Sequence, residues 1–123
     1  MKGVGIDLCG IARIERAVEQ NERFLTKYYT EAEREWIRRK GKAGMHSAAA
    51  MFAAKEAFWK ACGIGIGMGV DMCEIEVLHD ELGAPRYQLY GKAKEKMESI
   101  GAQTAWLSLT HEADTAAAVC VLE

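Results

Sequence analysis

The stretch AAMFAAKEAFWKACG (residues 49–63) is rich in alanine and aromatic residues and predicts a long helix over about residues 46–62. Gly63 is a natural stop for it, since glycine readily adopts the left-handed conformation that follows many helices. Glu56 and Lys60 lie four residues apart, in the favourable order for an ion pair on one helix face. One interpretation is therefore a solvated surface ion pair. Their neighbours are Ala, Phe and Trp, however, which equally favours a pair that is buried or lines a cleft.

Strands and shorter helices are predicted before this helix. Residues 2–8 alternate between apolar and small or polar residues, as a strand does. Apolar residues at helical spacing then predict a helix, with Ile11, Ile14 and Val18 on its inner face. Thr30 and Glu33 form a capping-box pattern, so another helix is expected to begin near residue 31.

After the long helix, the pattern returns to strands. EIEVLH (74–79) and RYQLY (86–90) flank a turn, which predicts a hairpin. An amphipathic helix is expected over residues 92–100, followed by the strands TAWLSLT (104–110) and TAAAVCVL (115–122), joined at residues 111–114. This order predicts a single α+β domain over residues 1–123, with an antiparallel sheet packed on helices.

The composition excludes several classes of protein. The chain has 123 residues, a formal charge of -2, 50% hydrophobic and 28% charged residues, as ordinary globular domains do. No overall charge attracts nucleic acid or anionic lipid, and no apolar run approaches the ~20 residues that span a bilayer. The N-terminus lacks the apolar segment of a signal peptide, and the four cysteines are widely separated. We therefore expect a cytoplasmic protein with buried, unpaired thiols and neither a nucleic-acid nor a membrane partner.

Asp7 and His111 are further candidates for chemistry. Asp7 follows Gly3 and Gly5, which leave room for another group to approach the strand. It could cap the next helix, or it could bind Mg²⁺, which prefers carboxylate oxygens. His111, in the stretch SLTHEAD, could be structural, or it could donate to a phosphate or accept a proton. Two carboxylates and a lysine would suit a polyphosphate ligand.

The glycine-rich stretch GIGIGMG (63–69) follows the long helix instead of opening one. Phosphate-binding loops use helix N-termini, where free N–H groups point at the anion. The stretch also lacks the context that GxGxxG and GxxxxGK[ST] motifs require. We interpret it as a helix cap and an extended connection, in which Gly63 and Gly65 line a ligand cleft.

Three segments together resemble the holo-acyl-carrier-protein synthase family of 4′-phosphopantetheinyl transferases. They are GVGIDLCGIARI (3–14), FAAKEAFWKACGIGIG (52–67) and WLSLTHEADTAAAVCVLE (106–123), in the family's order. The resemblance covers essentially the whole chain and implies the 4′-phosphopantetheinyl transferase fold. It also implies an enzyme that moves the 4′-phosphopantetheine group of coenzyme A onto a serine of apo acyl carrier protein, in support of fatty acid biosynthesis.

The resemblance implies a role for each candidate residue. Asp7 and Glu56 match the two carboxylates that hold Mg²⁺, while Lys60 and His111 match residues that contact the coenzyme A phosphates, with the cleft at Gly63 belonging to the same ligand. In the implied reaction the serine hydroxyl attacks the β-phosphorus of coenzyme A, and 3′,5′-ADP leaves. Glu56 could also orient a water molecule that accepts the serine proton.

The family resemblance further implies protein partners. Arg13, Arg23 and Phe24 match the surface that docks the carrier protein, although a solvated charged face would look the same in sequence. Family members are typically trimers with active sites between protomers, so we expect a homotrimer.

Several positions depart from the family pattern. Met51 stands where an arginine is common, and Gly10 where an acidic residue is common. The region 38–46 also matches poorly, which leaves Lys42 and His46 as candidates for holding the 3′-phosphate of coenzyme A. Two other functions stay open from sequence: a non-catalytic binding module that kept the fold, and a Mg²⁺-dependent nucleotide-binding protein or phosphohydrolase.

Overall fold

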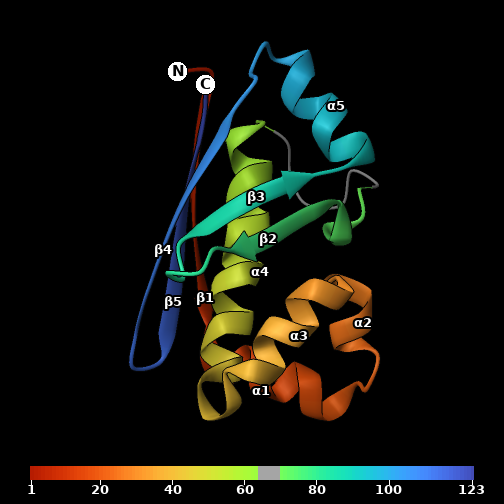
Figure 1. Cartoon of the computed structure of the whole chain (residues 1–123), viewed down its shortest axis with the longest axis vertical. Coiled ribbons are helices and arrows are strands. Elements are labelled where there is room, and N and C mark those ends of the chain that lie inside the picture. The colour runs from red at the N-terminus through yellow and green to blue at the C-terminus, as the bar shows by residue number, and fades with distance from the viewer. Residues whose placement is uncertain (64–69) are drawn as a thin grey trace.

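The long helix α4 (Gly44–Ala61) is the central element of the computed structural model, which describes residues 1–63 and 70–123. It runs along the long axis of the molecule, and every other layer packs against it (Figure 1). Its alanines let neighbouring elements approach closely, so nearly all of its residues are buried. The predicted helix is confirmed, beginning two residues earlier and ending one residue earlier than expected. Gly63 follows its C-cap with φ +75°.

An antiparallel sheet covers one side of α4. Its strand order is β1 (Gly3–Gly10), β5 (Thr115–Leu122) and β4 (Ala105–Glu112). The predicted strands are confirmed, but the predicted connection is too long. His111 and Glu112 continue β4 and pair with β5, which leaves only Ala113 and Asp114 in the turn. The ladder is longer than expected because a tight turn, with Ala113 at φ 37°, closes the hairpin.

Strand β1 packs unusually close to α4. A Cβ atom at Gly3 would lie 2.1 Å from the carbonyl oxygen of Ala61, and one at Gly5 would lie 2.0 Å from that of Ala57. No other residue type fits at these two positions without moving the backbone. The glycines therefore set the distance between β1 and α4, and with it the position of Asp7 beside the helix.

The outer face of this sheet is apolar. Because β1 turns its glycine face inward, Val4, Ile6 and Leu8 point outward and are 55%, 64% and 66% exposed. The neighbouring strands add Val121 and Trp106, which share the register position of Val4 on the same face. An apolar patch of this kind on a sheet is typical of an interaction surface.

A second, two-stranded sheet also packs against α4 and lies next to strand β4 of the first sheet. It is the predicted hairpin of β2 (Ile75–His79) and β3 (Pro85–Leu89), closed by a turn in which the Asp80 carboxylate accepts two backbone N–H bonds. Helix α5 (Gly91–Ser99) confirms the helix predicted over residues 92–100, shifted by one residue at each end, and it buries Ala93 and Met97.

Three helices lie around the N-terminal end of α4, far from the chain termini (Figure 1). They are α1 (Ile11–Gln20), α2 (Phe24–Tyr28) and α3 (Glu31–Arg39), and short 3₁₀ turns, η1 (Gly41–Ala43) and η2 (Met72–Glu74), complete the fold. The capping box at Thr30 and Glu33 is confirmed. The sequence did not predict α2, which is too short to show periodicity. In residues 1–63 and 70–123, no helix has the combination of length and apolar character needed to cross a bilayer.

Candidate functional site

Asp7 and Lys60 form an ion pair between β1 and α4. The Lys60 ammonium donates to Asp7 Oδ1 at 2.8 Å and to the Ile6 carbonyl oxygen at 3.1 Å. Asp7 is 8% exposed, whereas the Lys60 side chain is half exposed. The alternative that Asp7 caps the next helix is wrong, because α1 has Gly10 as its N-cap and no side-chain cap. Asp7 is therefore a buried carboxylate whose partner comes from α4.

Glu56 lies one turn before Lys60 on α4 and is 8% exposed. The interpretation of Glu56 and Lys60 as a solvated ion pair is wrong, because in the described part of the chain Lys60 pairs with Asp7 instead. Burial raises the pKa of the Glu56 carboxyl to about 7. The neighbouring Asp7 carboxylate also raises this pKa, while Arg13 and Lys60 act to lower it. Two carboxylates thus share one buried site and resist being charged together.

The two carboxylates fit a hard cation. Asp7 Oδ2 is buried and has no hydrogen-bond partner, a costly state for a charged oxygen unless another group binds there. Over residues 1–63 and 70–123, no group of three or more His, Cys, Asp or Glu side chains could hold a metal ion as a closed cage. Mg²⁺ needs no such cage, because it binds one or two carboxylates together with waters and substrate phosphates. Asp7 and Glu56 therefore suit Mg²⁺ bound with a phosphate ligand.

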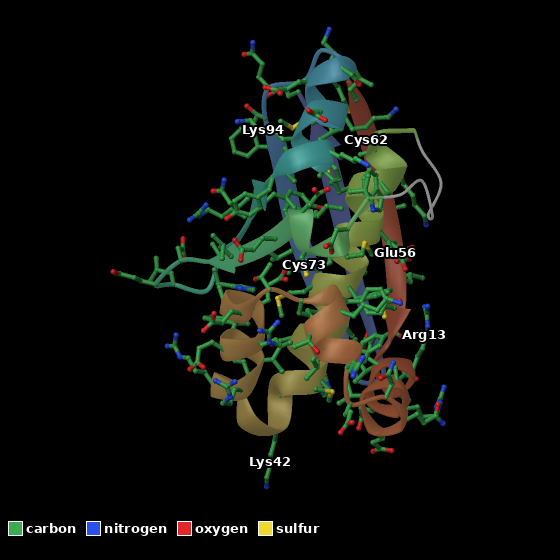
Figure 2. The ribbon with its side chains drawn as sticks, turned by 90° about the vertical axis from the view of Figure 1, so that its right-hand side faces the viewer. Arg13, Lys42, Glu56, Cys62, Cys73 and Lys94 are labelled. Atoms are coloured by element: carbon green, nitrogen blue, oxygen red, sulfur yellow. The ribbon has the colours of Figure 1, made fainter. Side chains whose placement is uncertain are left out.

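An aromatic cluster lies beside this site, one turn before Glu56. The Phe24 and Phe52 rings stack with centroids 6.2 Å apart, and Tyr28 contacts both rings. The guanidinium of Arg13 lies 5.7 Å from the centroid of the Phe52 ring. Figure 2 shows Arg13 below Glu56 on the same side of the molecule. The structure thus brings two of the three predicted docking residues close to the carboxylates.

Arg23, the third predicted docking residue, is exposed at the N-cap of α2. Its backbone N–H donates to the Asn21 side chain, and its carbonyl oxygen accepts from Thr26. Tyr28 was not among the predicted site residues, because the five-residue helix that aligns it with Phe24 is too short to show periodicity.

His111 does not join Asp7 in the described part of the same chain. It lies two strands away on β4, where its ring faces that of His46 at a centroid distance of 5.4 Å. His46 is in the first turn of α4, and its Nδ1 is buried without a hydrogen-bond partner. Lys42 lies in η1 and extends away from the molecule (Figure 2). The imidazole pair and the carboxylate pair therefore occupy different parts of one chain.

Gly63 follows the C-cap of α4, three residues after Lys60. Gly65 lies outside the described residues. Lys55, the residue before Glu56, is fully buried and was not among the predicted site residues. A charged residue within an alanine-rich helix that is apolar on all sides was the available signal.

Comparisons with known proteins agree on one family. The 4′-phosphopantetheinyl transferase superfamily matches residues 3–120. The holo-[acyl-carrier-protein] synthase of Syntrophus aciditrophicus is 44% identical over 122 residues, 98% of this chain and 94% of the relative. The crystal structure of the Helicobacter pylori holo-[acyl-carrier-protein] synthase in complex with coenzyme A has a TM-score of 0.83 and 34% identity, covering 98% of this chain and 99% of that one. The corresponding enzyme of Neisseria meningitidis has a TM-score of 0.86 and 36% identity, covering 100% of this chain and 98% of that one.

Proposed function

The chain belongs to the 4′-phosphopantetheinyl transferase superfamily, and from this premise we propose that Asp7, Glu56 and Lys60 form its reaction centre. Its activity is that of a holo-acyl-carrier-protein synthase, which transfers 4′-phosphopantetheine from coenzyme A to apo acyl carrier protein. The observation that carries the assignment of the centre is the buried Asp7–Glu56 pair with the unpartnered Asp7 Oδ2. A phosphate-bound cation is the ligand that such a pair accommodates best.

Each residue of this centre has a distinct task in the proposal. Asp7 and Glu56 would hold Mg²⁺, which when bound would neutralise charge at the diphosphate. The Lys60 ammonium contacts the coenzyme A phosphates from the exposed side of the Asp7 carboxylate. The serine hydroxyl of the carrier forms the new bond to the β-phosphorus, the bond from that phosphorus to the oxygen bridging to the α-phosphate breaks, and 3′,5′-ADP leaves with the electron pair.

The proton of the serine hydroxyl needs an acceptor. We propose that Glu56 orients a water molecule toward it, since a carboxylate oxygen accepts a hydrogen bond from water and aligns it for proton transfer. Replacement of Glu56 by Gln keeps the size of the side chain and removes its basicity. Turnover of that variant close to that of the original chain would exclude this role.

We propose that the chain works as a homotrimer. The support is the apolar outer face of the β1–β5–β4 sheet, which includes Val4, Ile6, Leu8 and Trp106 and would be covered by copies of the same chain. Light scattering after size exclusion should give three times the 13.6 kDa mass of one chain. If the original chain is a monomer at micromolar concentration, the proposal is contradicted. The variant Ile6→Asp, in contrast, is expected to be monomeric, because it places a charge in the apolar face.

The trimer also offers a role for His111. Since His111 lies apart from Asp7 in its own chain, we propose that it contacts a phosphate of coenzyme A bound at Asp7 of a neighbouring protomer. His46 faces His111 and could share this ligand, as could Lys42. Gly63, three residues after Lys60, is proposed to line the ligand cleft together with Gly65, which lies outside the described residues.

The carrier protein is proposed to dock on Arg13, Arg23 and Phe24. Arg13 and Phe24 contact the aromatic cluster that leads to Glu56, so a carrier bound there would bring its serine toward the carboxylates. Arginines steer acidic partners and bind their carboxylates in a bidentate manner.

We further propose a cytoplasmic location and a role in fatty acid biosynthesis. The four free cysteines fit a reducing compartment.

Intact mass spectrometry of apo acyl carrier protein, incubated with this chain, coenzyme A and Mg²⁺, tests the proposal. The expected result is a gain of one phosphopantetheine group on the carrier, which is lost with EDTA and in Glu56→Ala. Release of 3′,5′-ADP without carrier would instead indicate a phosphohydrolase. Binding of coenzyme A without transfer to any of several carriers would indicate a binding module.

A further inference from the structure

Lys55 is a fully buried cation next to Glu56 in sequence. Its side chain is 0% exposed, and its ammonium makes three hydrogen bonds, which use all of its N–H donors. They go to Glu33 Oε1 at 2.9 Å, to the Met72 carbonyl oxygen at 2.9 Å and to the Ile75 carbonyl oxygen at 2.8 Å. One side chain of α4 thus joins α3, η2 and the start of β2.

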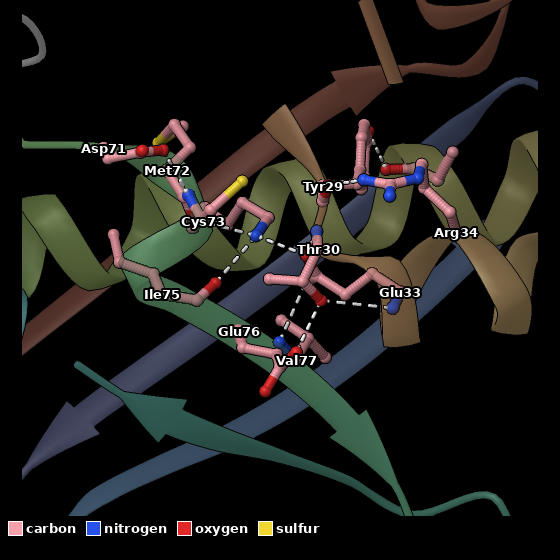
Figure 3. A network of polar contacts seen from close by, with 12 residues as sticks. Tyr29, Thr30, Glu33, Arg34, Asp71, Met72, Cys73, Ile75, Glu76 and Val77 are labelled. Carbon is pink, nitrogen blue, oxygen red and sulfur yellow. Dashed lines mark hydrogen bonds and ion pairs between the residues drawn. The ribbon is translucent and has the colours of Figure 1, made fainter. Parts of the chain in front are cut away.

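Glu33 completes the connection from α3. Its Oε1 also accepts from the Thr30 backbone N–H at 2.8 Å, and its Oε2 accepts from the Val77 N–H at 2.8 Å. Figure 3 shows these groups converging between α3, α4 and β2. Glu33 therefore does more than close the capping box that the sequence predicted, because the same carboxylate holds β2 and the α4 cation.

Two hydroxyl groups extend the network away from α4. Thr30 donates its hydroxyl to Glu76 Oε2, and the Tyr90 hydroxyl donates to Glu76 Oε1 at 2.9 Å. The carboxylate of Glu76 is also buried. The network thus links the N-terminus of α3 to β2 and to Tyr90, which lies between β3 and α5.

Stability alone is a poor explanation for this pair. Two buried charges lose their hydration, and well-packed apolar residues of similar volume are often as stable or more stable. What an ion pair with five directional hydrogen bonds supplies is a defined geometry between the elements that it joins. The element that matters here is α4, since it carries both Glu56 and Lys60.

We propose that Lys55 and Glu33 are positioning residues that set the rotation of α4 at which Glu56 faces Asp7. Successive side chains diverge by about 100° around a helix, so the direction of Lys55 toward α3 determines the direction of Glu56 toward β1. On the β1 side the close contact is made through Gly5, which has no side chain, and the hydrogen bonds to β1 come from Lys60, whose side chain is half exposed. The Lys55–Glu33 pair adds a directional restraint on α4 that is fully buried.

The inference rests on the proposed function for the meaning of Glu56, and its test uses two readouts on the full chain. The variant is Glu33→Gln combined with Lys55→Met, which removes both charges and leaves neither one buried alone. The readouts are the kinetic constants of transfer and the affinity for Mn²⁺, measured by electron paramagnetic resonance with coenzyme A present. We expect a kcat at least tenfold lower, a Mn²⁺ dissociation constant at least fivefold higher, and a KM for coenzyme A within twofold.

A matched control removes an exposed ion pair from α3, the helix that carries Glu33. Arg38 and Glu35 pair on α3, with side chains 71% and 54% exposed, and Glu35→Gln with Arg38→Gln should change neither readout. A cooperatively unfolding double variant of Lys55 and Glu33 with unchanged kcat and Mn²⁺ affinity would refute the inference. If that variant does not fold, Glu33→Asp keeps the charge but shortens its reach. It should weaken both readouts, and unchanged values would again refute the inference.

The two hypotheses fail in different ways. If the original chain transfers nothing to apo carrier, the proposed function is wrong, whatever the variants do. If the original chain is active and binds Mn²⁺ while the neutralised pair does the same, only the positioning role is wrong. Transfer and Mn²⁺ affinity that are both lowered only in the buried-pair variants would support the inference.

Discussion

Replacement of Glu56 by Gln should make the protein more stable at alkaline pH and leave it unchanged at acidic pH. Glu56 is buried beside the Asp7 carboxylate, and its pKa rises from an ordinary value of 4.5 to about 7. A raised pKa means that the native state binds more protons than the unfolded state between these two pH values. The stability contributed by the neutral carboxyl is therefore complete below pH 4.5 and is lost as the pH rises through about 7.

The magnitude follows from the two pKa values. Each pH unit between them corresponds to about 1.4 kcal/mol, so ionised Glu56 lowers the free energy of unfolding by roughly 3 kcal/mol at pH 8. Glutamine has nearly the same shape and never ionises. The stability difference between Glu56→Gln and the original chain should thus grow from near zero at pH 4.5 to roughly 3 kcal/mol at pH 8.

Urea denaturation followed by tryptophan fluorescence measures this difference, at one fixed protein concentration because assembly also adds stability. EDTA should be present, since bound cations favour the ionised carboxylate. Adding Mg²⁺ and coenzyme A at pH 8 should then stabilise the original chain more than the variant. A stability difference that stays constant from pH 4.5 to 8 would refute the interpretation of Glu56 as a carboxyl held neutral by burial.

Three further outcomes follow from the same geometry. Gly5→Ala places a Cβ 2.0 Å from a backbone oxygen of α4 and should lower the unfolding free energy by roughly 3 kcal/mol. Gly10→Ala, whose Cβ has its nearest contact 3.9 Å away, should change the unfolding free energy little, and thermal melts of the two variants compare them. Lys60→Gln removes a charged hydrogen bond and should lower kcat/KM for coenzyme A by about ten- to a hundredfold in the transfer assay, and an unchanged value would exclude phosphate contact. Charge reversal of Arg13 and Arg23 should raise the KM for the carrier by roughly tenfold and leave the KM for coenzyme A unchanged. If the variant and the original chain have the same KM for the carrier, the docking surface lies elsewhere.

The identity of most elements could be read from the sequence because the signals are local. Alanine and aromatic content predicted α4, the capping box at Thr30 located the start of α3, and apolar alternation predicted the strands. The short helix α2 was not predicted, because five residues show no periodicity. The full length of β4 was not predicted either, because a tight turn leaves little signal in the sequence.

The candidate residues of the site were also visible in the sequence, but their relations were not. The spacing of Glu56 and Lys60 suggested a pair within α4, whereas Lys60 pairs with Asp7 from a strand more than 50 residues away. His111 was expected in a turn near the same ligand, and it lies on β4 beside His46. Such pairings depend on which elements pack together, and a local pattern carries no record of that.

What the sequence determined by itself is the set of helices and strands and the residue types available for chemistry, because propensity and periodicity act over a few neighbouring residues. The tertiary structure decided which carboxylates are buried together, which lysine is exposed and which is enclosed. Gly5 lets β1 pack directly against α4, and Asp7 and Glu56 are buried where these two elements meet. Burial of a charge is a property of all its surroundings, so the raised pKa of Glu56 and the enclosed ion pair of Lys55 arise only in the folded chain.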